Sequence, residues 1–148
     1  MAPLPDVKRT SRVRPTVQST FHIDFKWWQD RDRDWRVFLQ SLLCPEHQHA
    51  FADLPDDHLV DFVDPLTAEV QRVDGLQHIL ITHCAKLEGF ISPHTTLVDA
   101  IFRIFLASGN IPMTPLELAQ ISGRSPDLIL RVLTGEQIYR GLRPTVEG

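Results

Sequence analysis

The chain has 148 residues, of which 43% are hydrophobic and 23% are charged, and its formal net charge is -4. This composition is typical of a globular protein and excludes a wholly disordered chain, and the length suits one domain with or without a small appendage. The longest apolar clusters, 79–81 and 97–106, are too short or too interrupted to span a bilayer. The N-terminus also lacks the apolar segment of a secretory signal, so we expect a cytoplasmic protein.

Charge is distributed unevenly along the chain. Residues 44–75 carry eight acidic side chains against one arginine, whereas the first sixteen residues are basic and contain three prolines without apolar periodicity. Such a composition predicts a flexible basic arm over residues 1–16. The basic residues of the arm are Lys8, Arg9, Arg12 and Arg14.

Apolar and polar side chains alternate over residues 17–27, which predicts a strand with one buried face. Trp27 lies on that face, so Trp28 would point to the opposite side, where a large exposed aromatic side chain suits partner binding. Alternatively, the strand ends at Trp27 and Trp28 packs beneath the next helix. A single strand needs a pairing partner, which is either the wing described below or a second copy of the chain.

The middle of the chain alternates helical and loop signals. Asp34 is placed to cap a helix over residues 35–42, whose apolar residues follow helical spacing. The acidic stretch 44–64 is expected to be mainly loop, with one short helix near 57–62. Asp64-Pro65 is typical of a helix start and predicts a helix through Val73.

A further helix is expected from Asp74 to about Leu87, because Asp74 and Gln77 stand at the spacing of a capping box. Asp74-Gly75 is also compatible with a hairpin turn between short strands. We favour the helix, because the residues that follow keep a helical period.

Three helices are expected in the last third of the chain. Residues 97–106 are apolar around most of a helix, which predicts the centre of the core. Thr114-Pro115 and Ser125-Pro126 are each typical of a cap followed by a first helical residue, and Gly123 lies between these two helices, where a tight turn needs a residue free to take positive φ.

The spacing of Ala119, Gly123, Ile129 and Val132 is typical of three helices packed through a tight turn. In this pattern, residues 95–146 resemble the winged helix-turn-helix superfamily of bacterial DNA-binding regulators and the related modules that dock on proteins. After Gly135, the stretch 137–146 has the composition of a two-stranded wing with Gly141 at its centre, and Pro144 would confine its second strand to a sheet edge.

The expected fold is therefore mainly α with a small β component. We expect an arm over residues 1–16, a strand and helical region over 17–94, and a winged helix-turn-helix-like region over 95–148.

The resemblance implies that the third helix enters the major groove of duplex DNA and that the wing touches the DNA backbone. At 100° per residue, Ile129, Val132 and Leu133 face the core, which leaves Asp127, Arg131 and Thr134 outward. Arg131 and Thr134 are the candidates for base contacts. The candidates for phosphate contacts are Arg124, Arg140 and Arg143.

We therefore expect a small transcriptional regulator that binds DNA as a homodimer through the N-terminal strand and helix, without a cofactor. The alternative is a non-enzymatic winged helix that docks on a protein complex, with the acidic segment 44–75 as its charged surface and Trp28 as its anchor. An enzyme is the least favoured class, because no phosphate loop or nucleophile motif is present. The acidic surroundings of Cys44 also oppose a thiolate.

Two cysteines are too few for a disulfide framework, and we expect both to be reduced. Cys44, His47 and Cys84 are weak candidates for a metal site, with His49 and His83 close to them in sequence. A metal-dependent sensor is a third option, but we expect no metal here. Adjacent helical residues such as His83 and Cys84 diverge by about 100° and would rarely face one ion.

Overall fold

The computed structural model describes residues 14–51, 59–63, 68, 70–92 and 94–145, and structural statements below refer to them. The fold is mainly helical with a small β component, as expected, and no helix in this part of the chain is long and apolar enough to cross a membrane. The helices are α2 (Phe25–Arg31), α3 (Trp35–Leu42), α4 (Pro45–Phe51), α5 (Gly75–Thr82), the short 3-10 helix η1 (Cys84–Lys86), α6 (Leu97–Ala107), α7 (Pro115–Ser122) and α8 (Pro126–Leu133). The strands are β1 (Phe21–Ile23), β2 (Leu59–Val63), β3 (Val70–Asp74) and β4 (Leu142–Pro144).

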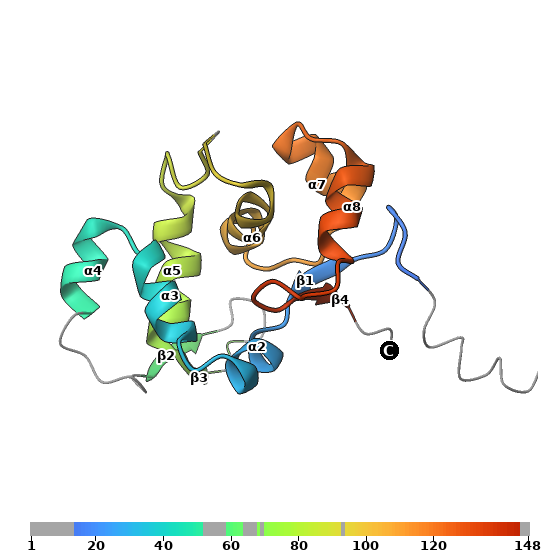
Figure 1. Cartoon of the computed structure of the whole chain (residues 1–148). Helices are drawn as coiled ribbons and strands as arrows, with labels where there is room; N and C mark the ends of the chain where they lie inside the picture. Colours follow the sequence, from blue (N-terminus) through green and yellow to red (C-terminus); the bar gives the residue numbers. More distant parts are fainter. Residues whose placement is uncertain (1–13, 52–58, 64–67, 69, 93, 146–148) are drawn as a thin grey trace, which may run out of the picture.

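Helix α6 lies at the centre of the core, as its apolar pattern predicts. It runs between the α3 and α5 pair on one side and the α7 and α8 pair on the other, above the β1 and β4 strands (Figure 1). Phe102 on α6 is fully buried, and its ring centroid lies 5.6 Å from both Trp28 and Phe38. Tyr139, near the C-terminus, also stacks edge-on against Phe102. One hydrophobic core therefore joins the N-terminal helices to the C-terminal third.

Strand β1 finds its partners within the chain. It pairs antiparallel with β4, and the backbones of Phe21 and Met113 exchange two hydrogen bonds on its other side. Asn110 extends that side, because its side-chain amide accepts from the N–H of Ile23 and donates to the Ile23 carbonyl. Both edges of β1 are thus occupied, so the expected dimerisation through this strand does not fit the structure.

The expected strand over 17–27 is mostly wrong, because only Phe21–Ile23 is extended. Asp24 ends it by accepting a hydrogen bond from the Trp27 N–H, which caps α2. Trp28 consequently lies in α2, one helical turn after Asp24. It is only 2% exposed, and its indole N–H donates to the Asp32 carboxylate. Trp28 is therefore a core residue and does not serve as an exposed anchor for a partner.

The acidic middle of the chain also differs from expectation. The helices expected near 57–62 and over 65–73 are wrong where the structure describes these ranges, because residues 59–63 (β2) and 70–74 (β3) pair as antiparallel strands, and residues 57–58, 65–67 and 69 lie outside the described residues. An unexpected helix, α4, follows Cys44. The helix expected after Asp74 is confirmed as α5, with the Asp74 carboxylate accepting from the Gln77 N–H, although it ends at Thr82 rather than near Leu87.

Candidate nucleic-acid interface and a cysteine–histidine cluster

The turn between α7 and α8 has the geometry that its sequence predicts. Thr114 and Glu117 form a reciprocal capping box at the start of α7. Gly123 ends that helix in the left-handed conformation with φ of 76°, and its N–H donates to the Ala119 carbonyl. The Ser125 hydroxyl then accepts from the Leu128 N–H and begins α8. Local capping thus fixes both ends of the turn.

The apolar faces of α7 and α8 pack against α6. Leu118 on α7 and Ile129 on α8 are fully buried, and Leu133 is nearly so. Ala119 and Val132 are half-buried and pack against the same core. The interior contacts expected for a compact three-helix unit are therefore present.

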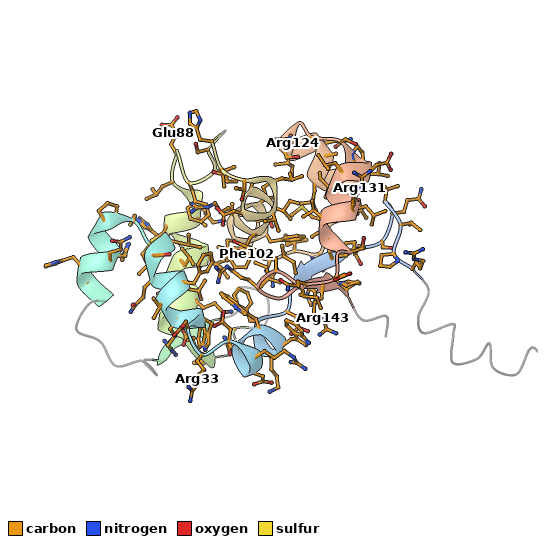
Figure 2. All side chains as sticks on the ribbon, viewed as in Figure 1. Arg33, Glu88, Phe102, Arg124, Arg131 and Arg143 are labelled. Carbon is orange, nitrogen blue, oxygen red and sulfur yellow. The ribbon has the colours of Figure 1, made fainter. Side chains whose placement is uncertain are left out.

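The opposite face of α8 is open to solvent. Asp127, Arg131 and Thr134 are all exposed, as expected, and Arg124 is exposed in the turn before α8. Figure 2 shows Arg124 and Arg131 at the same end of the molecule, on the α7 and α8 unit. Neither arginine forms an ion pair with any residue that the structure describes, whereas the Thr134 hydroxyl donates to the Leu130 carbonyl.

Arg140 and Arg143 are already engaged within the chain. Arg143 donates to the Asp24 carboxylate at 3.0 Å and lies over the Trp27 ring. Arg140 covers the Phe38 ring, with its guanidinium carbon 3.6 Å from the ring centroid, and its Nη1 lies 3.9 Å from Asp32. From the sequence we predicted that both arginines contact phosphates. In the structure they instead connect the C-terminal segment to α2 and α3.

The wing is simpler than expected. One strand, β4, is formed over Leu142–Pro144, and it pairs with β1 instead of folding back on a second wing strand. Arg140 and Gly141 both have positive φ, which turns the chain into β4. Pro144 lies on this edge strand, as expected. Strand β4 therefore closes the β1 sheet.

The base of the N-terminal arm lies beside the helix-turn-helix. The Leu116 N–H, at the start of α7, donates to the carbonyl of Val17, and Arg14 is exposed three residues earlier. Among the described residues, Arg14 is therefore a further exposed cation, close in sequence to the segment that contacts α7. Lys8, Arg9 and Arg12 lie outside the described residues, as do most of the acidic side chains of segment 44–75.

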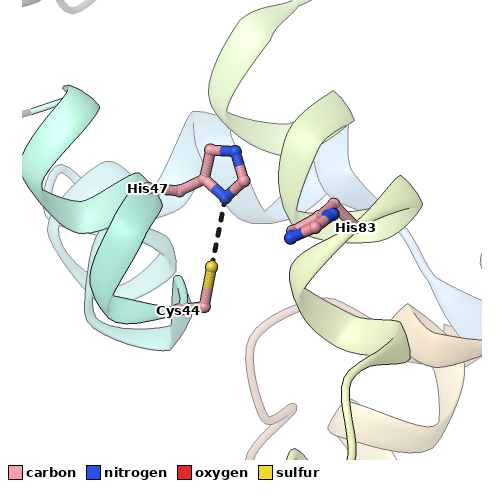
Figure 3. Close-up of side chains that lie close together, drawn as sticks. All are labelled: Cys44, His47 and His83. Atoms are coloured by element: carbon pink, nitrogen blue, oxygen red, sulfur yellow. Dashed lines mark hydrogen bonds between the residues drawn. The ribbon is translucent and has the colours of Figure 1, made fainter.

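A second constellation brings together four metal-ligating side chains, from the start of α4 and the end of α5. Cys44 Sγ lies 3.1 Å from His47 Nδ1, and Cys84 Sγ lies 3.4 Å from Cys44 Sγ and 3.5 Å from His47 Nδ1. The ligand atoms of Cys44, His47 and His83 all lie within 4.8 Å of one another (Figure 3). His49, also close in sequence, is exposed on α4 and does not belong to this group.

On one continuous helix, His83 and Cys84 would diverge, as expected from the sequence. Helix α5 instead ends at Thr82, where His83 caps it with φ of -127° and ψ of -65°, and Cys84 begins η1. The break in the helix lets both side chains approach α4. His83 was not among the metal candidates predicted from the sequence, although it directly precedes Cys84.

Burial governs the chemistry of the Cys84 thiol. Cys84 is only 2% exposed, and this desolvation raises the pKa of its thiol to about 11. The metal-free side chain is therefore a neutral thiol at neutral pH, which opposes a role as a nucleophile.

The structure describes two helices, α7 and α8, joined by a turn at Gly123, and the resemblance of residues 95–146 to the winged helix-turn-helix superfamily stays a prediction from the sequence. Comparison of the chain with protein-family models, with curated protein sequences and with solved structures gave no match.

Proposed function

We propose that this protein is a cytoplasmic DNA-binding regulator of transcription that inserts α8 into the major groove of duplex DNA. The observation that carries the proposal is the placement of Arg131 on the exposed face of a helix whose opposite face is buried against α6 and α7. A helix held in this way can enter the groove without losing its packing. Arg131 suits a guanine edge, and Thr134 at the end of α8 is the second candidate for a base contact.

Backbone contacts would come from the cations around α8. Arg124 is exposed in the turn before α8, and Arg14 is exposed three residues before Val17, whose carbonyl accepts from α7; both could neutralise phosphates, and the other basic residues of the arm precede Arg14 in the chain. Asp127 and Glu136 are exposed nearby and oppose this charge. One copy of the chain therefore has a small contact set, and a homodimer that uses a surface other than β1 would double it.

The test is fluorescence anisotropy of the full chain with random-sequence duplex DNA over a range of salt concentrations. We expect binding that weakens steeply between about 50 and 200 mM salt, because each phosphate contact releases counterions. Arg124→Ala should reduce the slope of log affinity against log salt by about 1, and Arg131→Ala should cost about 1–3 kcal/mol of affinity.

Arg33→Ala is the matched control for these variants. Arg33 is also exposed without an ion-pair partner in the described part of the chain, but it lies between α2 and α3, away from the α8 end (Figure 2). Its removal changes the net charge by the same amount and should leave DNA affinity almost unchanged. Equal losses for Arg33→Ala and Arg131→Ala would show nonspecific charge attraction and would contradict a role for α8.

The second candidate function is docking on a protein through the same unit. It is favoured by the engagement of Arg140 and Arg143 within the chain and by two exposed apolar side chains on α7, Leu116 at 41% and Ile121 at 57%. Ile121 also lines a pocket of about 350 Å³ between α6 and α7. Absence of salt-dependent DNA binding by the intact chain would favour this alternative over the first.

A further inference from the structure

We propose that Cys44, His47, His83 and Cys84 bind one zinc ion in a closed structural site that fastens α4 to the α5–η1 junction. This inference is independent of the nucleic-acid proposal, because α4 and α5 lie on the side of α6 opposite α8 (Figure 1). Two thiolates and two neutral imidazoles form one of the donor sets of tetrahedral structural zinc, and each cysteine thiol releases its proton to solvent when the ion binds.

The distances approach those of a tetrahedral zinc site. Two sulfur atoms that each lie about 2.3 Å from a tetrahedral ion are about 3.8 Å apart, and a sulfur and a nitrogen ligand are about 3.5 Å apart. Cys44 Sγ, Cys84 Sγ and His47 Nδ1 form a triangle with edges of 3.1, 3.4 and 3.5 Å. Small side-chain movements of a few tenths of an ångström would accommodate the ion between them.

His83 supplies the fourth donor. Its ring centroid lies 4.6 Å from that of His47, with the two ring planes inclined at 72°. Figure 3 shows the His83 ring approaching the Cys44 and His47 pair from the α5 side. With four protein ligands no coordination position stays open for water or substrate, so the site is structural rather than catalytic.

Helix α4 has little else to hold it in place. It is seven residues long, which is too short to be stable in isolation. Of its residues 45–50, none is buried, and His47 is the only one that is partly covered. The helix packs mainly against α3. A metal bound through Cys44 and His47 would provide the attachment that apolar packing does not.

Simple thiol chemistry does not account for the cluster. A disulfide requires the two sulfur atoms at about 2.05 Å, whereas Cys44 Sγ and Cys84 Sγ are 3.4 Å apart. A disulfide would also give no role to His47 on α4 and His83 at the end of α5, whose ligand atoms both lie within 4.8 Å of Cys44 Sγ. A shared ion explains all four positions together.

The first experiment measures metal content. The full chain is purified under reducing conditions without chelator, and its zinc and iron are quantified by mass spectrometry. We expect about one zinc per chain. Cys84→Ser and His83→Ala should each weaken zinc retention against a competing chelator by more than the roughly 10–100-fold that loss of an outer-shell partner costs. His49→Ala is the matched control, because His49 is exposed on the same helix, and it should retain zinc as the wild type does.

A second measurement covers the case in which a variant does not fold. Metal-free wild-type chain is titrated with Co²⁺, and its absorption spectrum is recorded. Intense visible bands of tetrahedral cobalt, together with thiolate charge-transfer absorption, support the site. Octahedral cobalt absorption, iron in place of zinc, or full zinc retention by Cys84→Ser would overturn the proposal.

Discussion

Gly141 is the position where a single methyl group should most clearly disturb the junction between the two ends of the chain. Its φ is +83°, and an added Cβ would lie 2.8 Å from the Asp24 carbonyl oxygen and 3.1 Å from the Trp28 Cβ. The Gly141 carbonyl also accepts a 2.7 Å hydrogen bond from the Asp24 N–H. Gly141→Ala must therefore displace backbone in the segment where β1 passes into α2.

Gly109→Ala separates steric overlap from backbone strain. Gly109 has a similar φ of +77°, but its added Cβ would meet nothing within 4 Å. Left-handed strain of about 1–2 kcal/mol applies to both variants and is partly offset by a gain of about 0.4–1 kcal/mol from the less flexible unfolded chain. Overlap adds about 1–3 kcal/mol for Gly141→Ala alone. We expect losses of about 1 kcal/mol for Gly109→Ala and about 2–4 kcal/mol for Gly141→Ala.

The assay is urea denaturation followed by tryptophan fluorescence and circular dichroism, with the free energy of unfolding extrapolated to water. If the unfolding free energy of the two variants falls with urea concentration at the same slope, their denatured states are comparable. If Gly141→Ala and Gly109→Ala lost the same stability within about 0.5 kcal/mol, which is near the uncertainty of the method, the close approach of residue 141 to α2 would be refuted.

Three further perturbations follow from the packing and the proposed metal site. Ile129→Ala should lose about 2–5 kcal/mol of unfolding free energy, because Ile129 is fully buried; a loss no larger than that of the exposed Leu116→Ala would contradict this packing. Asp24→Ala should cost about 1–2 kcal/mol, because its carboxylate caps α2 and pairs with Arg143. A double-mutant cycle with Arg143→Ala measures the pair, and a coupling energy of zero would argue against it. Metal chelation should lower the melting temperature of the wild type, by about 2–4 °C per kcal/mol lost, and leave that of Cys84→Ser unchanged.

Helices α7 and α8 and the turn between them were predictable because their signals are local. The Thr114 cap, the left-handed Gly123 and the Ser125 cap each act on residues no more than four positions away. The spacing of apolar residues then determined which face of α8 is buried, and the exposure of Arg131 followed from it.

The misassigned elements depend on contacts between distant residues. Phe25 and Trp27 continue the period-two pattern of β1, but the Asp24 side chain begins α2, and Trp28 is then buried against Phe102 on α6. Asp64-Pro65 is typical of a helix start but lies outside the described residues, whereas the flanking residues 59–63 and 70–74 pair with each other as strands. No local pattern reveals such pairings.

The same reason explains why the candidate sites were only partly predictable. Arg143 was expected to be free, but its partner Asp24 lies at the other end of the chain. The cysteine–histidine cluster depends on the backbone of His83 leaving the α5 helix, which brings Cys84 to Cys44. The candidate ligand residues could be identified from the sequence, whereas their proximity in space could not, because it depends on the tertiary fold.

The role of α8 is tested most directly by amide proton–nitrogen correlation spectra of the full chain titrated with duplex DNA. If α8 binds DNA, the resonance shifts concentrate on residues 123–134 and on Arg14, and they diminish in high salt. Shifts confined to the region of Arg33 and α4, or no shifts at low salt, would contradict DNA binding through this helix.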